Sequence, residues 1–373
     1  VHHLRNVELR RDLAELVNIF GFPCHGRGAL LLDYISGMVW RTIIRGFTNH
    51  PVPATLAAER RACKNFVALH KFRKRGVAIM SIGDTVYLNG VFTQRKDALI
   101  SPLDRGFLFS HAAYEVTAVY GGKLIDFEGH VSRLGNTLEA ISIPNPHDAA
   151  AWEDIHSQLI ARNGLSEGLI YLEVTAGAYD SRDFAGPETF TPTIFLYADH
   201  RPLISDKAEQ GIRAIFLNDI RWRRRDIKTT QLLSQALAYR AAREAGAETA
   251  FMVEDGHVTE AASANTWIVT EEGRIITRNL SSDILPGITR AHVIARLRNQ
   301  GLDIEERAFT PDEAYAAKEI FTTSAGAMIA PVIQLEDRPV GTGKPGAVTR
   351  QVQRLYYEAI GADVEKVAAW ALA

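Results

Sequence analysis

The sequence predicts a mixed α and β fold divided into two halves, and three observations support this. Strand-like and helix-like hydrophobic patterns alternate from residue 80 to the end of the chain. The segment 198–206 is polar, contains Pro202 and lacks periodicity, as is typical of a connection between domains. The 373 residues are 46% hydrophobic and 23% charged, a globular composition and a length that commonly forms two domains. We expect a small α/β domain over 80–200 and a larger domain over 207–373.

The hydrophobic patterns place the elements of both halves. Val86 and its neighbours predict a strand and turn over 85–90, with a return strand starting at 91. Apolar side chains at Val131, Leu134, Leu138 and Ile141 predict a helix over 130–141. The other predicted helices cover 147–162 and 230–245, start near 288, and cover 346–360; the other predicted strands cover 169–175, 193–197, 212–217, 249–254, 266–270 and 319–323.

Residues 1–79 differ in composition from the rest of the chain. They carry 13 Lys and Arg against 5 Asp and Glu, and they hold both cysteines, Cys24 and Cys63. A mitochondrial targeting arm would be rich in serine, but Ser36 is the only serine of this segment. The chain begins with Val1, as a GUG start codon read literally would give, and Met80 directly precedes the first strand pattern. We expect residues 1–79 to be a basic N-terminal extension that arises from a mis-assigned start, with a genuine extension as the alternative.

The charge and cysteine content exclude several classes of protein. The net charge of −2 provides no global basic field for a nucleic acid or an anionic membrane. The longest apolar run, over 28–40, contains Asp33 and is too short to cross a bilayer. Two cysteines cannot form a disulfide framework, which indicates a reducing compartment. We therefore expect a cytoplasmic protein that binds neither nucleic acid nor membrane.

Four segments of the second half carry candidate chemistry. Lys228 lies between Ile227 and Thr229 just before a predicted helix, where a desolvated amine would form imines, although a surface lysine in a basic loop fits the same pattern. Glu260 ends a short strand after the Asp255-Gly256 turn, either as a ligand for a heterocycle or as an exposed loop glutamate. The segments 285–290 and 321–326 offer glycine, hydroxyls and a helix start, which suit phosphate binding. Simple N-capping by Thr289 is the alternative for the first of these.

Taken together, the segments resemble the class IV pyridoxal-phosphate aminotransferases, also called fold type IV. The subgroup that the chain resembles most is bacterial D-amino-acid transaminase, and the resemblance extends from about residue 86 to 360. The matching motifs are Ser101-Pro-Leu-Asp-Arg-Gly-Phe107, Ala113-Tyr-Glu-Val116, His130-Val-Ser-Arg133, Asp219-Ile-Arg-Trp222, Asp226-Ile-Lys228, Val258-Thr-Glu260 and Leu285-Pro-Gly-Ile-Thr-Arg290. Several separate motifs in the same order make this a specific signal. The resemblance implies a two-domain α+β fold with pyridoxal 5'-phosphate as cofactor.

The resemblance also implies roles for individual residues. Lys228 would bind the cofactor covalently and shuttle a proton, and Glu260 would keep the ring nitrogen of the cofactor protonated. Arg133 would bind the cofactor phosphate, and Tyr114 would line the substrate pocket. The remaining phosphate ligands implied are Ile288, Thr289, Ser324 and Ala325, the last through its backbone N–H alone. Glu115 has the identity usual in the family, but we predict no role for it.

Departures from the family pattern concern the substrate. D-amino-acid members of the family carry an arginine after the Val-Thr pair and then an Arg-x-His motif for the substrate carboxylate. Here Ala176 replaces the first arginine and Phe184 replaces the histidine, which leaves Arg182 as the carboxylate ligand. Ser110-His111 also stands where the family usually has Gly-Asp. Recognition of the carboxylate is then weaker or shifted, and amine substrates become conceivable.

The resemblance leads to a function with stated alternatives. We expect a transaminase that moves the amino group of a D-amino acid such as D-alanine to a 2-oxo acid by a ping-pong mechanism, acting as a homodimer. Branched-chain L-amino-acid transamination is the next alternative, but those enzymes typically have a tyrosine five residues after the lysine, where this chain has Leu233. An (R)-amine transaminase or an activity like that of aminodeoxychorismate lyase is a further alternative. A non-catalytic binding protein would be favoured only if Lys228 or Glu260 were missing, and both are present.

Overall fold

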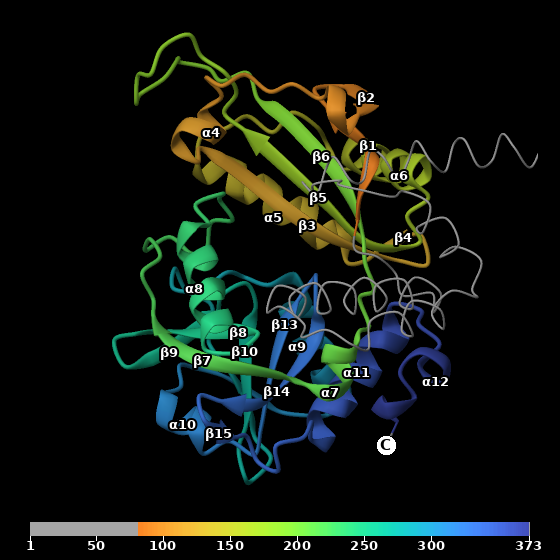
Figure 1. Cartoon of the computed structure of the whole chain (residues 1–373), viewed down its shortest axis with the longest axis vertical. Coiled ribbons are helices and arrows are strands. Elements are labelled where there is room, and N and C mark those ends of the chain that lie inside the picture. The colour runs from red at the N-terminus through yellow and green to blue at the C-terminus, as the bar shows by residue number, and fades with distance from the viewer. Residues whose placement is uncertain (1–80, 373) are drawn as a thin grey trace, which may run out of the picture. The chain divides into compact units, whose positions relative to one another are not determined.

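The computed structural model describes residues 81–372, so the expectation for residues 1–79 lies outside the described part of the chain. The described residues form two β-sheets with their helices (Figure 1). We call residues 81–200 the first lobe and residues 206–372 the second lobe. Among the described helices, none has the length and apolar character needed to cross a membrane.

The first lobe is built on a six-stranded antiparallel sheet. Its strand order is β2-β1-β6-β5-β3-β4. The two long helices of the lobe contact this sheet, and their buried Leu134, Leu138, Trp152 and Leu159 fill its core. The elements are β1 (Ser81–Leu88), β2 (Val91–Gln94), η2 (Arg95–Asp97), α4 (Arg105–Phe109), β3 (Ala112–Tyr120), β4 (Lys123–Leu124), α5 (Phe127–Ala140), α6 (Ala149–Asn163), β5 (Glu167–Thr175) and β6 (Thr193–His200).

The second lobe is built on a nine-stranded mixed sheet. Its order is β12-β11-β10-β13-β14-β7-β8-β9, and β15 pairs with β14. The pairs β11–β12, β14–β7 and β7–β8 are parallel and the others antiparallel. Its elements are α7 (Asp206–Gln210), β7 (Ile212–Asn218), α8 (Leu233–Glu244), β8 (Thr249–Glu254), β9 (His257–Ala261), β10 (Asn265–Val269), β11 (Ile275–Thr277), α9 (Ile288–Asn299), β12 (Ile304–Glu306), α10 (Pro311–Tyr315), β13 (Glu319–Ser324), β14 (Met328–Leu335), β15 (Arg338–Pro339), α11 (Ala347–Ala359), α12 (Val364–Val367) and η3 (Ala369–Ala371).

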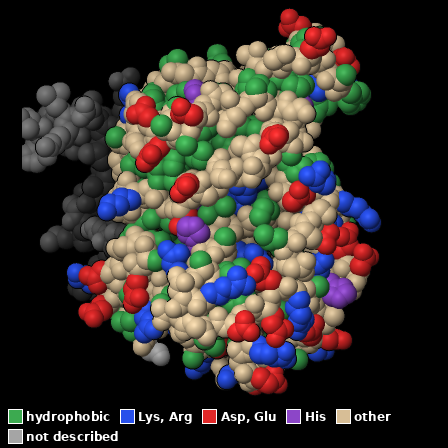
Figure 2. Space-filling model, turned by 180° about the vertical axis from the view of Figure 1, so that it is seen from behind, with side chains coloured by type: hydrophobic (Ala, Val, Ile, Leu, Met, Phe, Trp, Pro, Cys, Tyr) green, Lys and Arg blue, Asp and Glu red, His purple; other side chains and the backbone are tan. Residues whose placement is uncertain are grey.

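The surfaces of the two lobes differ in side-chain type on the face seen from behind. Positive and negative side chains are interspersed over the lower part of this view, which is the second lobe (Figure 2). Hydrophobic side chains are more frequent over the upper part, which is the first lobe (Figure 2).

The structure differs from the sequence-based prediction in several elements, among them β6, α8 and β14; short elements such as β4, β11, β12 and α10 were also not predicted. β6 extends to His200, inside the expected connection 198–206, because His200 pairs with Gly168 on one side and Ser81 on the other. α8 begins at Leu233 instead of 230, because Thr230 N donates to Ala112 O and holds that segment extended. β14 was not predicted as a strand, and its Pro331 would argue against a central position. Its pairing with β7 begins at Val332, one residue beyond the proline.

One of the hydrophobic clusters contains residues of both lobes. Ala118 and Leu169 of the first sheet belong to the same buried cluster as Trp267 and Phe321 of the second. Trp267 and Phe321 stack with ring centroids 5.3 Å apart. Tyr356 on α11 joins this cluster and donates its hydroxyl proton to Asp126 of the first lobe over 3.0 Å. Burial of shared apolar surface and this hydrogen bond therefore stabilise the contact between the two lobes.

Glu319 caps the N-terminus of α11 from the start of β13. Its carboxylate accepts hydrogen bonds from Val348 N at 3.0 Å, Thr349 N at 2.8 Å and the Thr349 hydroxyl at 2.7 Å. A Cβ at Gly346 would lie 2.1 Å from Cδ of Glu319, so only glycine allows this approach. A buried carboxylate at a helix N-terminus stabilises the free N–H groups and the helix dipole.

We predict that Glu319→Ala lowers the free energy of unfolding by about 2–3 kcal/mol, because it leaves buried donors without an acceptor. The melting temperature should fall by roughly 5 °C. Urea unfolding followed by circular dichroism measures the loss. Glu358→Ala, an exposed change near the end of α11, should stay within about 0.5 kcal/mol. Equal stability of the two variants would contradict the capping role.

Candidate functional site

Lys228 belongs to the second lobe but is bound to the first sheet. Its carbonyl oxygen accepts a hydrogen bond from Tyr114 N at 3.1 Å, and Thr229 forms a bridge with Ala113. Residues 228–230 thus continue the first sheet along the edge of β3. The Nζ atom of Lys228 lies 4.2 Å from the centre of the Tyr114 ring. The backbone pairing therefore fixes the amine over the face of an aromatic side chain.

Glu260 is buried on β9 among donors. Its carboxylate accepts hydrogen bonds from Asn265 Nδ2 at 3.1 Å and Leu285 N at 3.2 Å, and it forms an ion pair with Arg221. Burial raises the pKa of Glu260 above its ordinary value, although Arg221 and the Leu285 N–H oppose this rise. Glu260 is therefore a buried carboxylate that is paired with one arginine, Arg221.

Arg221 connects Glu260 to a second carboxylate. Its guanidinium donates to Asp219 from Nε at 3.0 Å and from Nη2 at 2.7 Å. Glu260 and Asp219 together raise the pKa of Arg221 despite its burial, so the guanidinium stays charged. We predicted no role for Arg221 within the segment Asp219-Ile-Arg-Trp222. The sequence signal for this pairing was the position of Arg221, two residues after Asp219, which directly follows the end of β7.

Arg133 is held on α5 by Glu115 of β3. Glu115 accepts from Nε and from Nη2 of Arg133, both at 2.8 Å, and lies 2.8 Å from His130 Nδ1. Burial by itself would raise the pKa of Glu115, but Arg133 and His130 hold it well below its usual range. The sequence left Glu115 without a role. A carboxylate amid the apolar strand pattern of residues 112–119 was the signal, because buried acids need a paired base.

Arg133 also reaches the start of α9 in the second lobe. Its Nη1 atom donates to Pro286 O at 2.8 Å, directly before the N-cap residue Gly287. The three hydrogen bonds to Glu115 and Pro286 leave two of the five guanidinium N–H groups for another acceptor. No side chain caps α9 at Gly287, and the first-turn N–H groups of Ile288 and Thr289 lie beside this guanidinium along the chain. Such a combination suits a phosphate.

Ser324 is the last residue of β13, and Ala325 directly follows it. Thr323 pairs with Asn265, the residue that donates to Glu260, so Ser324 and Ala325 continue from the strand end nearest that carboxylate. The Ser324 hydroxyl accepts from Ala327 N at 3.2 Å. Gly287 shares this neighbourhood, since a Cβ there would lie 2.0 Å from Asn265 Oδ1.

The groups named so far are joined by a continuous series of contacts. The series runs from Lys228 through the Tyr114 backbone to the adjacent Glu115, and from Glu115 to Arg133. It continues from Arg133 to Pro286 O, and the neighbouring Leu285 N donates to Glu260. An amine, a guanidinium and a buried carboxylate from separate parts of the sequence are thus linked by direct contacts.

Arg182 is the one predicted site residue that the described chain does not bring to this region. It is exposed on the loop between β5 and β6, and its guanidinium lies 5.4 Å from the Phe109 ring and 5.2 Å from the Phe184 ring. Arg105 anchors the same loop by donating to the Asp183 and Phe184 carbonyls, each at 2.7 Å. Arg105 therefore holds the loop in place, and Arg182 lies over these two rings.

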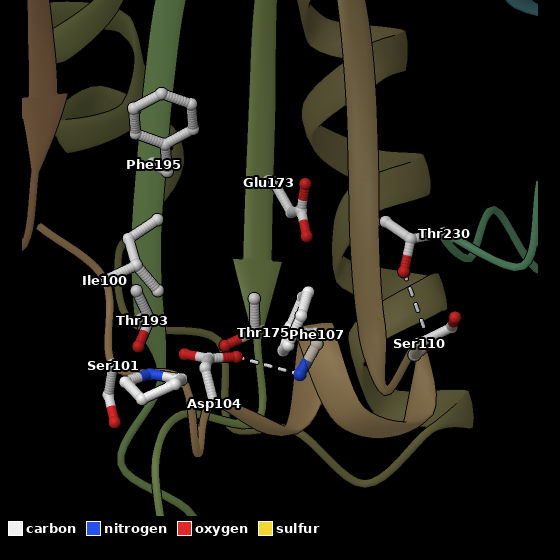
Figure 3. Close-up of a pocket in the computed structure, with 12 residues that line it drawn as sticks. Ile100, Ser101, Asp104, Phe107, Ser110, Glu173, Thr175, Thr193, Phe195 and Thr230 are labelled. Atoms are coloured by element: carbon white, nitrogen blue, oxygen red, sulfur yellow. Dashed lines mark hydrogen bonds between the residues drawn. The ribbon is translucent and has the colours of Figure 1, made fainter. Parts of the chain in front are cut away.

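A pocket of about 460 Å³ lies on the first sheet beside Tyr114. Glu173 of β5 pairs in register with Tyr114 and with Phe195, so the three side chains form a row on one face. Tyr171 stacks on Tyr114 at 5.7 Å in the same layer. The residues around the pocket are Ile100, Ser101, Pro102, Asp104, Gly106, Phe107, Ser110, Glu173, Thr175, Thr193, Phe195 and Thr230 (Figure 3).

Comparisons with known proteins identify the family of the chain. Residues 112–335 match the family described as amino-transferase class IV. The chain is 32% identical to D-alanine aminotransferase from Bacillus licheniformis over 75% of this chain and 99% of that protein. It is also 32% identical to D-alanine aminotransferase from Staphylococcus aureus (strain MSSA476), over 72% and 95%.

A solved structure shares the fold. The branched-chain amino acid aminotransferase of Escherichia coli matches with a TM-score of 0.69 at 22% identity, over 74% of this chain and 95% of that one. The family match covers more than half of the chain and includes Lys228, Glu260, Arg133 and Tyr114. This chain therefore belongs to the class IV aminotransferase family, with the mixed α and β fold of that family.

Proposed function

We propose that the protein is a pyridoxal 5'-phosphate-dependent transaminase that moves the amino group of a D-amino acid, such as D-alanine, to a 2-oxo acid. The continuous series of contacts from Lys228 to Glu260 carries this proposal, because it gathers the groups that such a reaction needs. The curated relatives at 32% identity are named D-alanine aminotransferases. The branched-chain enzyme shares the fold at 22% identity, and Leu233 is exposed and offers no phenol to the site. We propose the cytoplasm as its location.

The donor set fits pyridoxal phosphate. Arg133, the first-turn N–H groups of Ile288 and Thr289, and Ser324 with Ala325 would hold the phosphate. Glu260 would accept a hydrogen bond from the protonated ring nitrogen, and Lys228 would hold the aldehyde carbon. When bound, the cofactor would supply a conjugated ring that takes up the electron pair released at the substrate carbon.

Lys228 would act as the proton carrier. Its Nζ atom would take the proton from the α-carbon of the amino acid and return it to the cofactor carbon that receives the amino group. The ring of Tyr114, 4.2 Å from Nζ, limits the motion of the lysine side chain. In the second half-reaction the same proton transfers would run in reverse on the 2-oxo acid.

Glu260 would keep a positive charge on the cofactor ring. Donors from Asn265 and Leu285 fix one carboxylate oxygen, and Arg221 binds the other. Because Arg221 remains charged, it favours the ionised form of Glu260 over the neutral acid. A neutral amide in its place would leave the ring nitrogen without an anionic partner.

We further propose a homodimer in which the Arg182 loop of one subunit completes the site of the other. The first lobe exposes several large apolar side chains on this loop and on residues 99–107. An exposed apolar patch of this kind is typical of a protein–protein interface. These side chains are Leu99, Leu103, Phe107, Tyr179 and Phe184, with exposed fractions of 84%, 42%, 79%, 37% and 73%. Within its own chain, Arg182 lies over the Phe109 and Phe184 rings, and we propose that it serves the site of the second subunit.

We predict that Lys228→Ala lowers turnover at least about 100-fold, because it removes the proton carrier. Lys207→Ala, an exposed change on α7, is the control and should keep full activity. Borohydride reduction of the holoenzyme followed by peptide mapping tests the covalent link directly. Label on Lys207 or Lys318 instead of Lys228 would overturn the assignment.

We predict that Glu260→Gln keeps the covalent link to Lys228 but lowers turnover by about 100-fold, because the ring nitrogen loses its anionic partner. Single-turnover absorbance measurements with D-alanine separate this slower chemistry from weaker cofactor binding. Glu306→Gln, which also removes a carboxylate bound by arginines, is the control and should keep the wild-type rate. A wild-type rate for Glu260→Gln would exclude the proposed role.

We predict that Arg182→Ala raises KM for D-amino acids while largely sparing amines, because arginine binds carboxylates through two parallel hydrogen bonds. Mixed dimers show whether Arg182 binds the substrate in the site of its own subunit or in the site of the other subunit. Combining inactive Lys228→Ala subunits with Arg182→Ala subunits should restore one intact site per mixed dimer and hence a low KM. No recovery on mixing would show that Arg182 does not act across a dimer.

A further inference from the structure

The pocket beside Tyr114 contains carboxyl groups and no cation among the described residues (Figure 3). Glu173 stands between Tyr114 and Phe195 in the cross-strand row, so it lies one strand away from the aromatic ring that contacts Lys228. Thr230, two residues after Lys228, lines the same pocket. A substrate bound at Lys228 therefore has Glu173 within reach of its side chain.

Asp104 supplies a second carboxyl group at the base of this pocket. It is 1% exposed, and Oδ1 accepts the hydrogen bond of Gly106 N at 2.8 Å. Oδ2 is buried and has no hydrogen-bond partner in the described part of the chain. Figure 3 shows the second oxygen of Asp104 directed toward Thr193, on the side away from the Gly106 contact. A buried carboxylate oxygen without a donor indicates a place for a ligand that donates.

The neighbouring arginine does not neutralise these carboxyl groups. Arg105 directs its guanidinium at the Asp183 and Phe184 carbonyls and packs against the Phe109 and Phe190 rings. The Glu173 carboxylate has one polar contact, from the Tyr171 hydroxyl at 2.7 Å. Burial, together with the charge of Asp104, raises the pKa of Glu173, although Tyr171 opposes this rise. A bound cation would relieve the repulsion between the two acids.

We propose that this pocket binds a positively charged group at the end of the substrate side chain, with Glu173 as the specificity-determining residue. The inference rests on the proposed function and narrows its substrate class to D-amino acids with a second amino group, such as D-ornithine and D-lysine. The volume of about 460 Å³ accommodates a side chain of three or four carbons with its ammonium group. The ammonium donates to Glu173 and to Oδ2 of Asp104, while Phe195 and Ile100 pack against the methylene groups.

A pair of matched substrates tests the proposal. D-ornithine is D-norvaline with a terminal ammonium group, so the ratio of their kcat/KM values isolates the contribution of the charge. The wild-type enzyme should prefer D-ornithine, and Glu173→Gln should lower the ratio by about tenfold, as the loss of a charge-assisted hydrogen bond implies. Glu167→Gln on the far end of the same strand is the control and should keep the wild-type ratio.

A binding measurement separates failure of this proposal from failure of the proposed function. Methylguanidinium carries the charge but cannot be transaminated, and calorimetric titration of the holoenzyme should show binding that Glu173→Gln weakens. If no D-amino acid reacts but methylguanidinium binds in this way, the transaminase assignment fails and the cation pocket stands.

An unchanged D-ornithine to D-norvaline ratio in Glu173→Gln would overturn the cation pocket. If the same variant also weakens the dimer, the pocket binds the Arg182 side chain of a second subunit instead.

Discussion

The buried ion pair between Glu115 and Arg133 is the interaction on which the candidate site depends. Two hydrogen bonds of 2.8 Å orient the guanidinium, and its third bond reaches Pro286 in the other lobe. Loss of one partner would leave an uncompensated buried charge, at a cost of about 3–5 kcal/mol. The pair is thus both a structural link between the lobes and the support for an anion-binding group.

Lys228 is likewise held by contacts between the two lobes. The residue follows the second-lobe strand β7, yet its backbone pairs with β3 of the first sheet. A lysine on a free loop would lose side-chain and backbone entropy on every productive encounter with its target. Attachment to a strand edge fixes the backbone in advance, which is the condition for placing a reacting group reproducibly.

Charge is distributed unevenly around the site, and each part has a chemical consequence. The region near α9 and Arg133 is electropositive and suits a phosphate. Burial raises the pKa of Glu260, and the charged Arg221 paired with it opposes this rise. The pocket at Glu173 and Asp104 holds carboxyl groups without a matching base among its lining residues. Cofactor binding and side-chain recognition thus use opposite charges in adjacent regions.

The sequence by itself determined the family and the mixed fold and proposed the principal residues, because motifs such as Asp226-Ile-Lys228 and Val258-Thr-Glu260 are local and keep their order. Hydrophobic periodicity also located the long helices and many of the strands, although it missed several strands, among them β11, β12 and β14. Only the tertiary structure assigned Glu115 to Arg133, Arg221 to Glu260, and Glu173 to the pocket beside Tyr114. These pairings join residues 18 to 59 positions apart in the chain, and strand register and lobe packing, which local patterns do not encode, bring them together.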